Sequence, residues 1–299
     1  MLEKLNECKL CPKNCKVNRN DGKLGFCNAS NKVKIARAAL HYFEEPCISG
    51  DKGSGTVFFS CCNMKCVYCQ NYKISTKNFG SEISIERLSE IFLELQEKGA
   101  LNINLVTPTP YVPQIIEALK IAKSNGLNIP IVYNTSSYEN VETIKMLDGY
   151  IDIYLADLKY YDDSYGLKYS NVSNYFYHAS NAIEEMVNQI KENVFDDNGV
   201  MKKGIIIRHM IIPGLKHDSK NLIKYLYNKY KDKIYISIMN QYTPLKHIKN
   251  YPEINRTLSN EEYDEIINYA IELGINNGFI QEGETCNESF IPDFDNEGV

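Results

Sequence analysis

Two features are missing from this chain of 299 residues: a long apolar run and an excess of charge of either sign. No stretch approaches the roughly 18 consecutive apolar residues of a membrane-spanning helix, and residues 1–7 lack the apolar core of a secretory signal. Lysine and arginine number 33 against 38 aspartates and glutamates, which leaves a net charge of −5. We therefore expect a cytoplasmic protein that binds neither nucleic acid nor membrane.

Apolar residues are plentiful enough for a full-sized core. A hydrophobic content of 43% with 24% charged residues and 17 glycines excludes a disordered or collagen-like chain. A length near 300 residues would nominally give about two domains, but α/β barrels often reach this size as one domain.

Cysteine is abundant and unevenly placed. Nine of the ten cysteines lie in the first quarter of the chain, at positions 8, 11, 15, 27, 47, 61, 62, 66 and 69, and the last is Cys286. Without an export signal, such a set indicates metal or redox chemistry rather than disulfides. The spacing favours two ligand groups, with Cys47, Cys61 and Cys286 as packing residues.

From residue 55 onward, short β-rich runs alternate with longer amphipathic runs, which is typical of a parallel sheet covered by helices. The expected strands are 55–60, 102–106, 129–134, 151–157, 204–212 and 234–239, with a shorter candidate at 278–281. The expected helices are 85–99, 111–125, 139–148, 175–193, 219–230 and 259–274. Six βα units are two short of a closed eightfold barrel, so the sequence predicts an α/β fold with an open, partial (βα)6 barrel.

This alternation also predicts how the chain is divided. Residues 1–50 form a cysteine-rich N-terminal extension with a candidate second metal site, residues 51–285 form the barrel core, and residues 286–299 form a C-terminal tail. Active sites of βα folds lie at the C-terminal ends of the strands. The cysteine-rich loop that follows the first strand is expected at that end.

That loop reads Cys62-Asn63-Met64-Lys65-Cys66-Val67-Tyr68-Cys69, a C-x3-C-x2-C pattern. Three thiolates this close in sequence can bind one small metal centre. An iron–sulfur cluster normally has four cysteine ligands, so three would leave one iron with an open position. The alternative is a zinc site of three cysteines and a histidine.

The loop, with an aromatic residue before its third cysteine and a (βα)6 pattern around it, resembles the radical S-adenosylmethionine (SAM) superfamily. The chain is most similar to proteins related to pyruvate formate-lyase activating enzyme. Supporting motifs are Glu44-Glu45-Pro46, Gly53-Ser54-Gly55-Thr56, Gln70-Asn71-Tyr72, Arg208-His209, Pro213-Gly214 and Phe290-Ile291-Pro292-Asp293-Phe294-Asp295. The resemblance implies a [4Fe–4S] cluster on Cys62, Cys66 and Cys69 that binds SAM. One-electron reduction of that pair would yield methionine and a 5′-deoxyadenosyl radical.

The resemblance also assigns cofactor-binding roles to side chains near the strand ends. Tyr68 would lie against the adenine of SAM, with simple packing as its alternative. Asp157 and Lys159, which alternation places on one face of a strand, would help to hold SAM, and a plain buried ion pair is the alternative. Arg208 would pair with the SAM carboxylate.

Two further positions, Asn134 and Thr107, depart from the patterns of the family. Asn134 and Thr135 match an Asp-Thr pair at a cation site, and asparagine removes the charge that a cation would need. Thr107 stands where many members have a glutamate for the SAM amino group, so a hydroxyl would have to take over that role. His209 points to the other face of its strand and is read as a structural histidine.

The N-terminal cysteines at 8, 11, 15 and 27 form a separate set. Four thiols at short spacing suit either a closed zinc site or an auxiliary iron–sulfur cluster. Unligated thiols are the remaining interpretation of Cys8, Cys11, Cys15 and Cys27.

Three hypotheses about function follow. The first is an activase that installs a glycyl radical on a partner enzyme, with a low-potential donor such as flavodoxin or ferredoxin. The second keeps the radical chemistry and gives it a small molecule or a peptide as substrate. The third is a zinc-stabilised binding module without catalysis.

Overall fold

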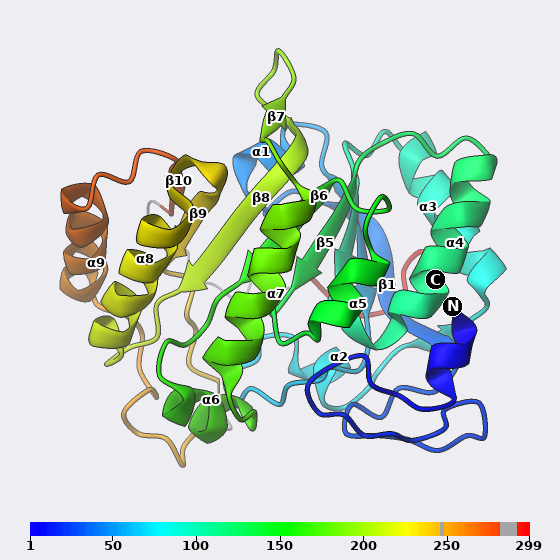
Figure 1. The fold of residues 1–299 in the computed structure, drawn as a ribbon, viewed down its shortest axis with the longest axis horizontal. Coiled ribbons are helices and arrows are strands. Elements are labelled where there is room, and N and C mark those ends of the chain that lie inside the picture. Colours follow the sequence, from blue (N-terminus) through cyan, green and yellow to red (C-terminus); the bar gives the residue numbers. More distant parts are fainter. Residues whose placement is uncertain (246–247, 282–291) are drawn as a thin grey trace.

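A computed structural model describes residues 1–245, 248–281 and 292–299 of the chain (Figure 1). Its centre is a sheet with the strand order β10-β9-β8-β6-β5-β4-β2-β1-β3. The seven strands from β2 to β10 along this path are parallel. They are β2 (Ser54–Phe59), β4 (Ile103–Val106), β5 (Ile131–Thr135), β6 (Ile153–Asp157), β8 (Met201–Met210), β9 (Tyr235–Met239) and β10 (Gly278–Ile280).

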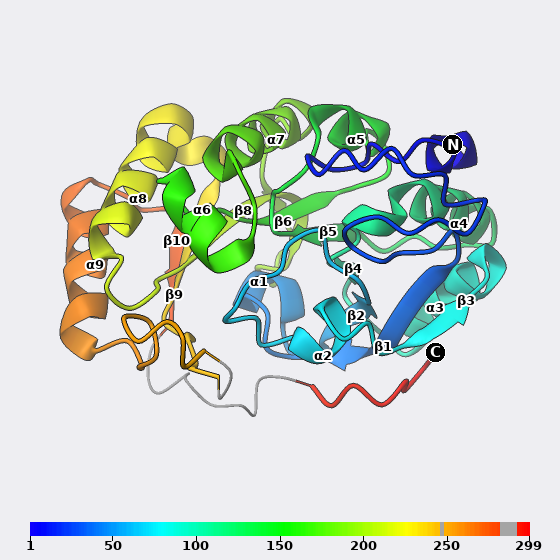
Figure 2. The same cartoon turned by 90° about the horizontal axis from the view of Figure 1, so that it is seen from below.

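Helices cover the convex side of the sheet, and the six expected from the sequence are all present. They are α3 (Ile85–Glu97), α4 (Val112–Ser124), α5 (Val141–Met146), α7 (Tyr175–Gln189), α8 (Lys216–Tyr230) and α9 (Asn260–Glu272). Figure 2 shows these helices as an arc around the strands. The prediction of an open α/β partial barrel is confirmed.

Local sequence explains where these elements begin and how they pack. The Ser84 side chain accepts a hydrogen bond from the Arg87 amide at the start of α3. Ser259 and Glu262 form a reciprocal capping box at the start of α9. Every residue of β2 is buried, as expected for a parallel strand covered on both faces.

The structure adds elements that the periodicity did not predict. Strand β1 (Val33–His41) lies within the stretch expected to be an extension, and it pairs antiparallel with β2. Strand β3 (Ser81–Ile83) pairs with β1 in turn, and the short β7 (Val194–Phe195) pairs with β8. The remaining short elements are the helices α1 (Pro46–Ser49), α2 (Tyr72–Ser75) and α6 (Asp163–Ser170), and the 3-10 turns η1 (Leu2–Leu5), η2 (Thr109–Tyr111) and η3 (Lys231–Lys233).

The segment that precedes β1 packs against the barrel beside α4 and α5, as Figure 2 shows. The buried Arg19 side chain donates hydrogen bonds to the carbonyl oxygens of Pro110 (2.5 Å) and Ser30 (3.0 Å from Nε). The Thr143 hydroxyl donates to the Leu10 carbonyl oxygen at 2.8 Å. These bonds hold the cysteine-rich segment near the C-terminal ends of β4 and β5.

The C-terminal residues return to β1. The Ala38 amide donates to the Glu297 carbonyl oxygen at 2.8 Å, and the Asn296 amide donates to the Ala36 carbonyl oxygen at 3.0 Å. Cys286, predicted to be a packing residue, lies outside the described residues, as do Phe290 and Ile291 of the C-terminal motif. Among the described residues, no helix is both long and apolar enough to cross a membrane.

Candidate functional site

A cavity of about 240 Å³ opens at the C-terminal ends of the parallel strands. Its lining includes all ten residues that the sequence assigned to the core site: Cys62, Cys66, Tyr68, Cys69, Thr107, Asn134, Thr135, Asp157, Lys159 and Arg208. The strand registers explain this convergence, since Val106 is paired with Asn134, Thr135 with Ala156 and Asp157 with Arg208. The parallel sheet therefore brings polar strand ends to one edge.

The cysteine loop runs along one wall of this cavity, between β2 and α2. Its backbone is fixed to the end of α6, because the Lys65 amide donates to the Ser170 carbonyl oxygen (3.0 Å) and the Val67 amide donates to that of Tyr169 (2.8 Å). These bonds flank Cys66 on both sides. The loop is thus held in place by a helix that lies a hundred residues away in the sequence.

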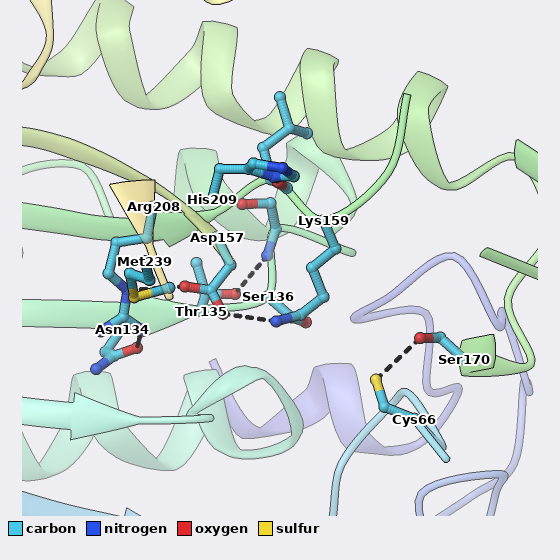
Figure 3. Close-up of polar contacts among 12 residues, drawn as sticks. Cys66, Asn134, Thr135, Ser136, Asp157, Lys159, Ser170, Arg208, His209 and Met239 are labelled. Atoms are coloured by element: carbon cyan, nitrogen blue, oxygen red, sulfur yellow. Dashed lines mark hydrogen bonds and ion pairs between the residues drawn. The ribbon is translucent and has the colours of Figure 1, made fainter. Parts of the chain in front are cut away.

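Each of the three thiols has its own hydrogen-bond partner. The Met64 amide donates to Cys62 Sγ at 3.4 Å, and the Ser170 hydroxyl donates to Cys66 Sγ at 3.0 Å (Figure 3). Cys69 Sγ lies 3.2 Å from the Ser75 hydroxyl. Donors directed at sulfur stabilise thiolates, which is the form that binds iron.

Without a metal, burial disfavours ionisation of these thiols. Burial raises the pKa of Cys62 and Cys69, and it raises the pKa of Cys66 to about 11 although the Lys159 ammonium opposes the shift. In the described part of the chain, no three His, Cys, Asp or Glu side chains are grouped as ligands of one metal ion. A cluster does not require its thiolates to meet at one metal ion, because each of them binds a different iron.

Opposite the loop lies a network of charges centred on Arg208 (Figure 3). Arg208 Nε donates to Asp157 Oδ1 at 2.8 Å, and its NH1 donates to Glu44 Oε2 at 2.9 Å. The third nitrogen, NH2, donates to Asn134 Oδ1 at 2.7 Å. Lys159 Nζ donates to Asp157 Oδ2 at 2.8 Å.

This network keeps Asp157 and Lys159 ionised. Burial opposes ionisation of Asp157, but the cations of Arg208 and Lys159 outweigh it and hold the pKa of Asp157 below its usual value. Burial also opposes protonation of Lys159, and the Asp157 and Cys66 side chains raise the pKa of Lys159 nonetheless. The cavity therefore presents fixed charges of both signs, which suits a zwitterionic ligand.

The two interpretations of Asp157 and Lys159 are compatible. The side chains form an ion pair, as the alternative expected, and they also line the cavity. Within the described chain, Asp157 is the one hydrogen-bond acceptor of the Lys159 ammonium. Because an ammonium has three donors, Lys159 can also bind an anionic group in the cavity.

The Arg208 guanidinium, predicted to bind the carboxylate of SAM, already donates hydrogen bonds to side chains of the protein. Three of the five guanidinium N–H donors have acceptors in the protein, so a ligand carboxylate could pair only with the second N–H of NH1 or of NH2. Glu44 was quoted in a motif without a role, and the structure shows that its carboxylate bridges Arg208 and the amides of Asn104 (3.1 Å) and Asn134 (3.2 Å). In the sequence, the only indication that Glu44 has a role was the pair of adjacent glutamates just before a proline.

The surroundings of three other residues from the sequence analysis differ. These residues are Tyr68, Thr107 and His209. Tyr68 lines the cavity, while its hydroxyl lies against that of Tyr160 and its ring packs on Tyr242. Thr107 has a φ of +60°, a strained conformation for a β-branched residue and one that is concentrated at functional sites. His209 is buried, with the Leu158 carbonyl at 2.9 Å and the Ser219 hydroxyl at 2.8 Å from its ring nitrogens, as expected for a structural histidine.

The four N-terminal cysteines converge on a second, smaller cavity of about 20 Å³. Cys8, Cys11, Cys15 and Cys27 all line it, together with Asn63 of the cysteine loop. The Phe26 amide donates to Cys15 Sγ at 3.3 Å. Chain segments from residue 8 to residue 27 are thus brought to one point, close to the first cavity and distinct from it.

A buried acid that the sequence analysis missed lies behind the cavity wall. Glu139 Oε1 accepts hydrogen bonds from the hydroxyls of Thr109 (2.6 Å), Thr135 (2.6 Å) and Tyr133 (3.1 Å). Its second oxygen, Oε2, is buried without a partner among the described residues. Burial raises the pKa of Glu139 from 4.5 to about 7, against the effect of the three hydroxyls.

Glu139 should therefore make the protein less stable as the pH rises from about 4.5 to about 7. In this window the folded protein binds a proton that the unfolded chain has lost, so the free energy of unfolding falls, by on the order of 3 kcal/mol for this group. Glu139→Gln keeps an oxygen for the hydroxyls and removes the titration. Urea unfolding at pH 5 and pH 8 should show a flatter pH dependence in the variant, and an unchanged one would contradict the assignment.

Comparisons with known proteins agree with this architecture. Residues 56–226 match the model of the radical SAM superfamily. The uncharacterized protein MJ0674 of Methanocaldococcus jannaschii is 31% identical over 272 residues, which cover 88% of this chain and 74% of that protein. Both the family match and this relative extend over more than half of the chain.

Two solved structures share the fold. A radical SAM methyltransferase from Sphaerobacter thermophilus aligns with a TM-score of 0.53 and 15% identity, over 77% of this chain and 67% of that one. SuiB of Streptococcus suis, bound to its precursor peptide SuiA, aligns with a TM-score of 0.50 and 14% identity over 75% of this chain. The chain spans about half the length of SuiB, since the alignment covers 47% of it. Together with the family match, the fold shows that the chain belongs to the radical SAM superfamily, whose cofactors are a [4Fe–4S] cluster and SAM.

Proposed function

We propose that Cys62, Cys66 and Cys69 hold the [4Fe–4S] cluster and that SAM binds between them and the network around Arg208. The observation that carries this proposal is that the three thiols and the charged network line a single cavity. The donor set fits the cluster, since three buried sulfurs on one loop leave one iron free for a ligand. Membership of an enzyme superfamily sets aside the hypothesis of a binding module without catalysis.

Different residues of the cavity would bind different groups of SAM. Lys159 offers donors to the carboxylate of SAM, and Asp157 and Glu44 supply the negative potential that its ammonium and sulfonium groups require. When bound, the cluster and SAM supply a 5′-deoxyadenosyl radical after one-electron reduction. The walls formed by Phe59 and Met64 keep water from the reacting atoms.

A polypeptide is the substrate class that the cavity mouth favours. A second hollow of about 170 Å³ shares His41, Phe43, Phe58 and Pro292 with the main cavity. Tyr42 and Phe43 are 51% and 58% exposed at this mouth. Exposed aromatic rings beside a reaction cavity are typical of surfaces that bind another protein.

Within that class, the leading target is a glycine of a partner enzyme, which would make the chain a glycyl radical activase. The support for this narrower assignment is the resemblance of the sequence motifs to pyruvate formate-lyase activating enzyme. A flavodoxin or ferredoxin would deliver the electron. The competing substrates are a peptide, which belongs to the same class, and a small molecule, which does not.

The activase proposal predicts a protein-based radical on the partner. The reconstituted protein, incubated anaerobically with dithionite, SAM and a candidate glycyl radical enzyme, should give the doublet of a glycyl radical by electron paramagnetic resonance. A partner with its acceptor glycine changed to alanine should give none. SAM cleavage without a glycyl signal from any candidate would favour the competing substrates.

We also propose a metal centre at Cys8, Cys11, Cys15 and Cys27. The four thiols line one cavity, and residues 6–32 contain no helix or strand that could organise them. Segments of this size without a core of their own usually need a metal or cross-link. Zinc and an auxiliary iron–sulfur cluster both remain candidates for this centre.

A further inference from the structure

A chain of three buried hydroxyls ends at the sulfur of Cys66. The hydroxyl of Tyr68 contacts that of Tyr160, and the Tyr160 hydroxyl lies 2.7 Å from the Ser170 hydroxyl. Ser170 Oγ lies 3.0 Å from Cys66 Sγ (Figure 3). Tyr68 is 4% exposed, and both Tyr160 and Ser170 are fully buried.

The sulfur determines the direction of every bond in this chain. A Cys66 thiolate bound to iron has no proton, so Ser170 must donate its only hydroxyl proton to it. Ser170 must then accept from Tyr160, and Tyr160 must accept from Tyr68. Each hydroxyl polarises the next in the same direction, which strengthens the final bond to sulfur.

Neither of the other two thiols has such a partner. Cys62 accepts from a backbone amide at 3.4 Å, and Cys69 lies 3.2 Å from Ser75, whose hydroxyl has no further hydroxyl behind it in the described residues. Ser170 is also held in place, because its carbonyl oxygen accepts from the Lys65 amide next to Cys66. The contact between Ser170 and Cys66 is therefore the shortest of the three, and among the described residues it alone continues into a chain of hydroxyls.

From this geometry we infer that Ser170 is a positioning residue that raises the reduction potential of the cluster through Cys66, with Tyr160 and Tyr68 as its support. The inference rests on the proposed function, which places the cluster on Cys66. Reduction adds negative charge to the cluster and its sulfurs. A donor fixed on a sulfur stabilises the reduced state more than the oxidised state, so it makes the electron easier to accept.

The test is a potentiometric titration of the reconstituted protein without SAM. In Ser170→Ala the ratio of reduced to oxidised cluster at a fixed potential should fall roughly tenfold, which is about 59 mV for one electron. Tyr160→Phe keeps Ser170 and removes its polarisation, so it should shift the potential in the same direction by less. Ser170→Thr keeps the hydroxyl and should restore the potential.

Ser89→Ala is the matched control, since Ser89 is a buried serine on α3 outside the cavity lining. It should leave the potential unchanged. Equal potentials in Ser170→Ala and the unaltered protein would overturn the inference. If Ser170→Ala fails to retain a cluster, the test rests on Tyr160→Phe. An unshifted reduction potential in Tyr160→Phe would then overturn the inference as well. Absence of any cluster in the unaltered protein would instead overturn the proposed function.

Discussion

Cys66→Ala is expected to abolish reductive cleavage of SAM, lowering the yield of 5′-deoxyadenosine by at least about a thousandfold, the cost typical of removing an essential catalytic group. Cys66 is the central thiol of the loop, and the backbone on both sides of it is fixed to α6. A cluster normally has four cysteine ligands and the proposed site offers three, so the two thiols that remain in the variant would not hold it. After anaerobic reconstitution, chromatography of the products measures the loss of SAM cleavage. Iron and sulfide analysis measures the loss of the cluster.

Cys11→Ala is the control that separates the two cysteine groups. Cys11 lines the smaller cavity and does not line the larger one, so this variant should retain most of the cleavage activity. Its metal content should fall instead, in zinc or in iron according to which metal the N-terminal thiols bind. Equal loss of cleavage in both variants would contradict two separate sites, and an unchanged metal content would mean that the N-terminal thiols are unligated.

The barrel was predictable because its two kinds of element have different sequence patterns. The strands are short continuous apolar runs, and the helices repeat apolar residues every three to four positions. Strand β8 contains Ile205, Ile206 and Ile207 in succession, all fully buried, which only a strand covered on both faces explains well. Strand β1 was missed because its segment follows the cysteines and was interpreted with them. Its antiparallel pairing with β2 depends on contacts between distant residues, which local patterns do not contain.

The candidate site was predictable for residues at the strand ends or in the cysteine loop. It was not predictable for residues that only tertiary contacts bring to the cavity. Cys62, Asp157 and Lys159 follow from spacing and resemblance. Ser170 lies at the end of α6, a helix with a weak apolar stripe, and nothing in its local sequence indicates that it reaches Cys66. Glu44 likewise reaches Arg208 only because β1 joins the sheet.

Arg208→Met is expected to lower the free energy of unfolding by about 3–5 kcal/mol, the range for removing one partner of a buried ion pair. The Arg208 side chain is 13% exposed, and its guanidinium lies between Asp157 and Glu44, with Glu45 Oε2 at 4.0 Å. Without it, the carboxyl groups of Asp157, Glu44 and Glu45, which are 17%, 10% and 6% exposed, lie near one another with Lys159 as the remaining nearby cation. Lys159 would compensate only part of their negative charge, and water would screen the rest poorly because the groups are mostly covered by protein.

Two further variants make this prediction specific. Arg37→Met removes an arginine whose partners Asp295 and Glu297 are 56% and 54% exposed, so urea unfolding should show a loss of no more than about 1 kcal/mol. Adding Glu44→Gln to Arg208→Met should recover part of the lost stability, because it removes one of the carboxylates that the arginine neutralised. Additive losses in the double variant would show that Glu44 and Arg208 are not coupled. In that case the arginine would stabilise the cavity by packing, and not by holding its acids together.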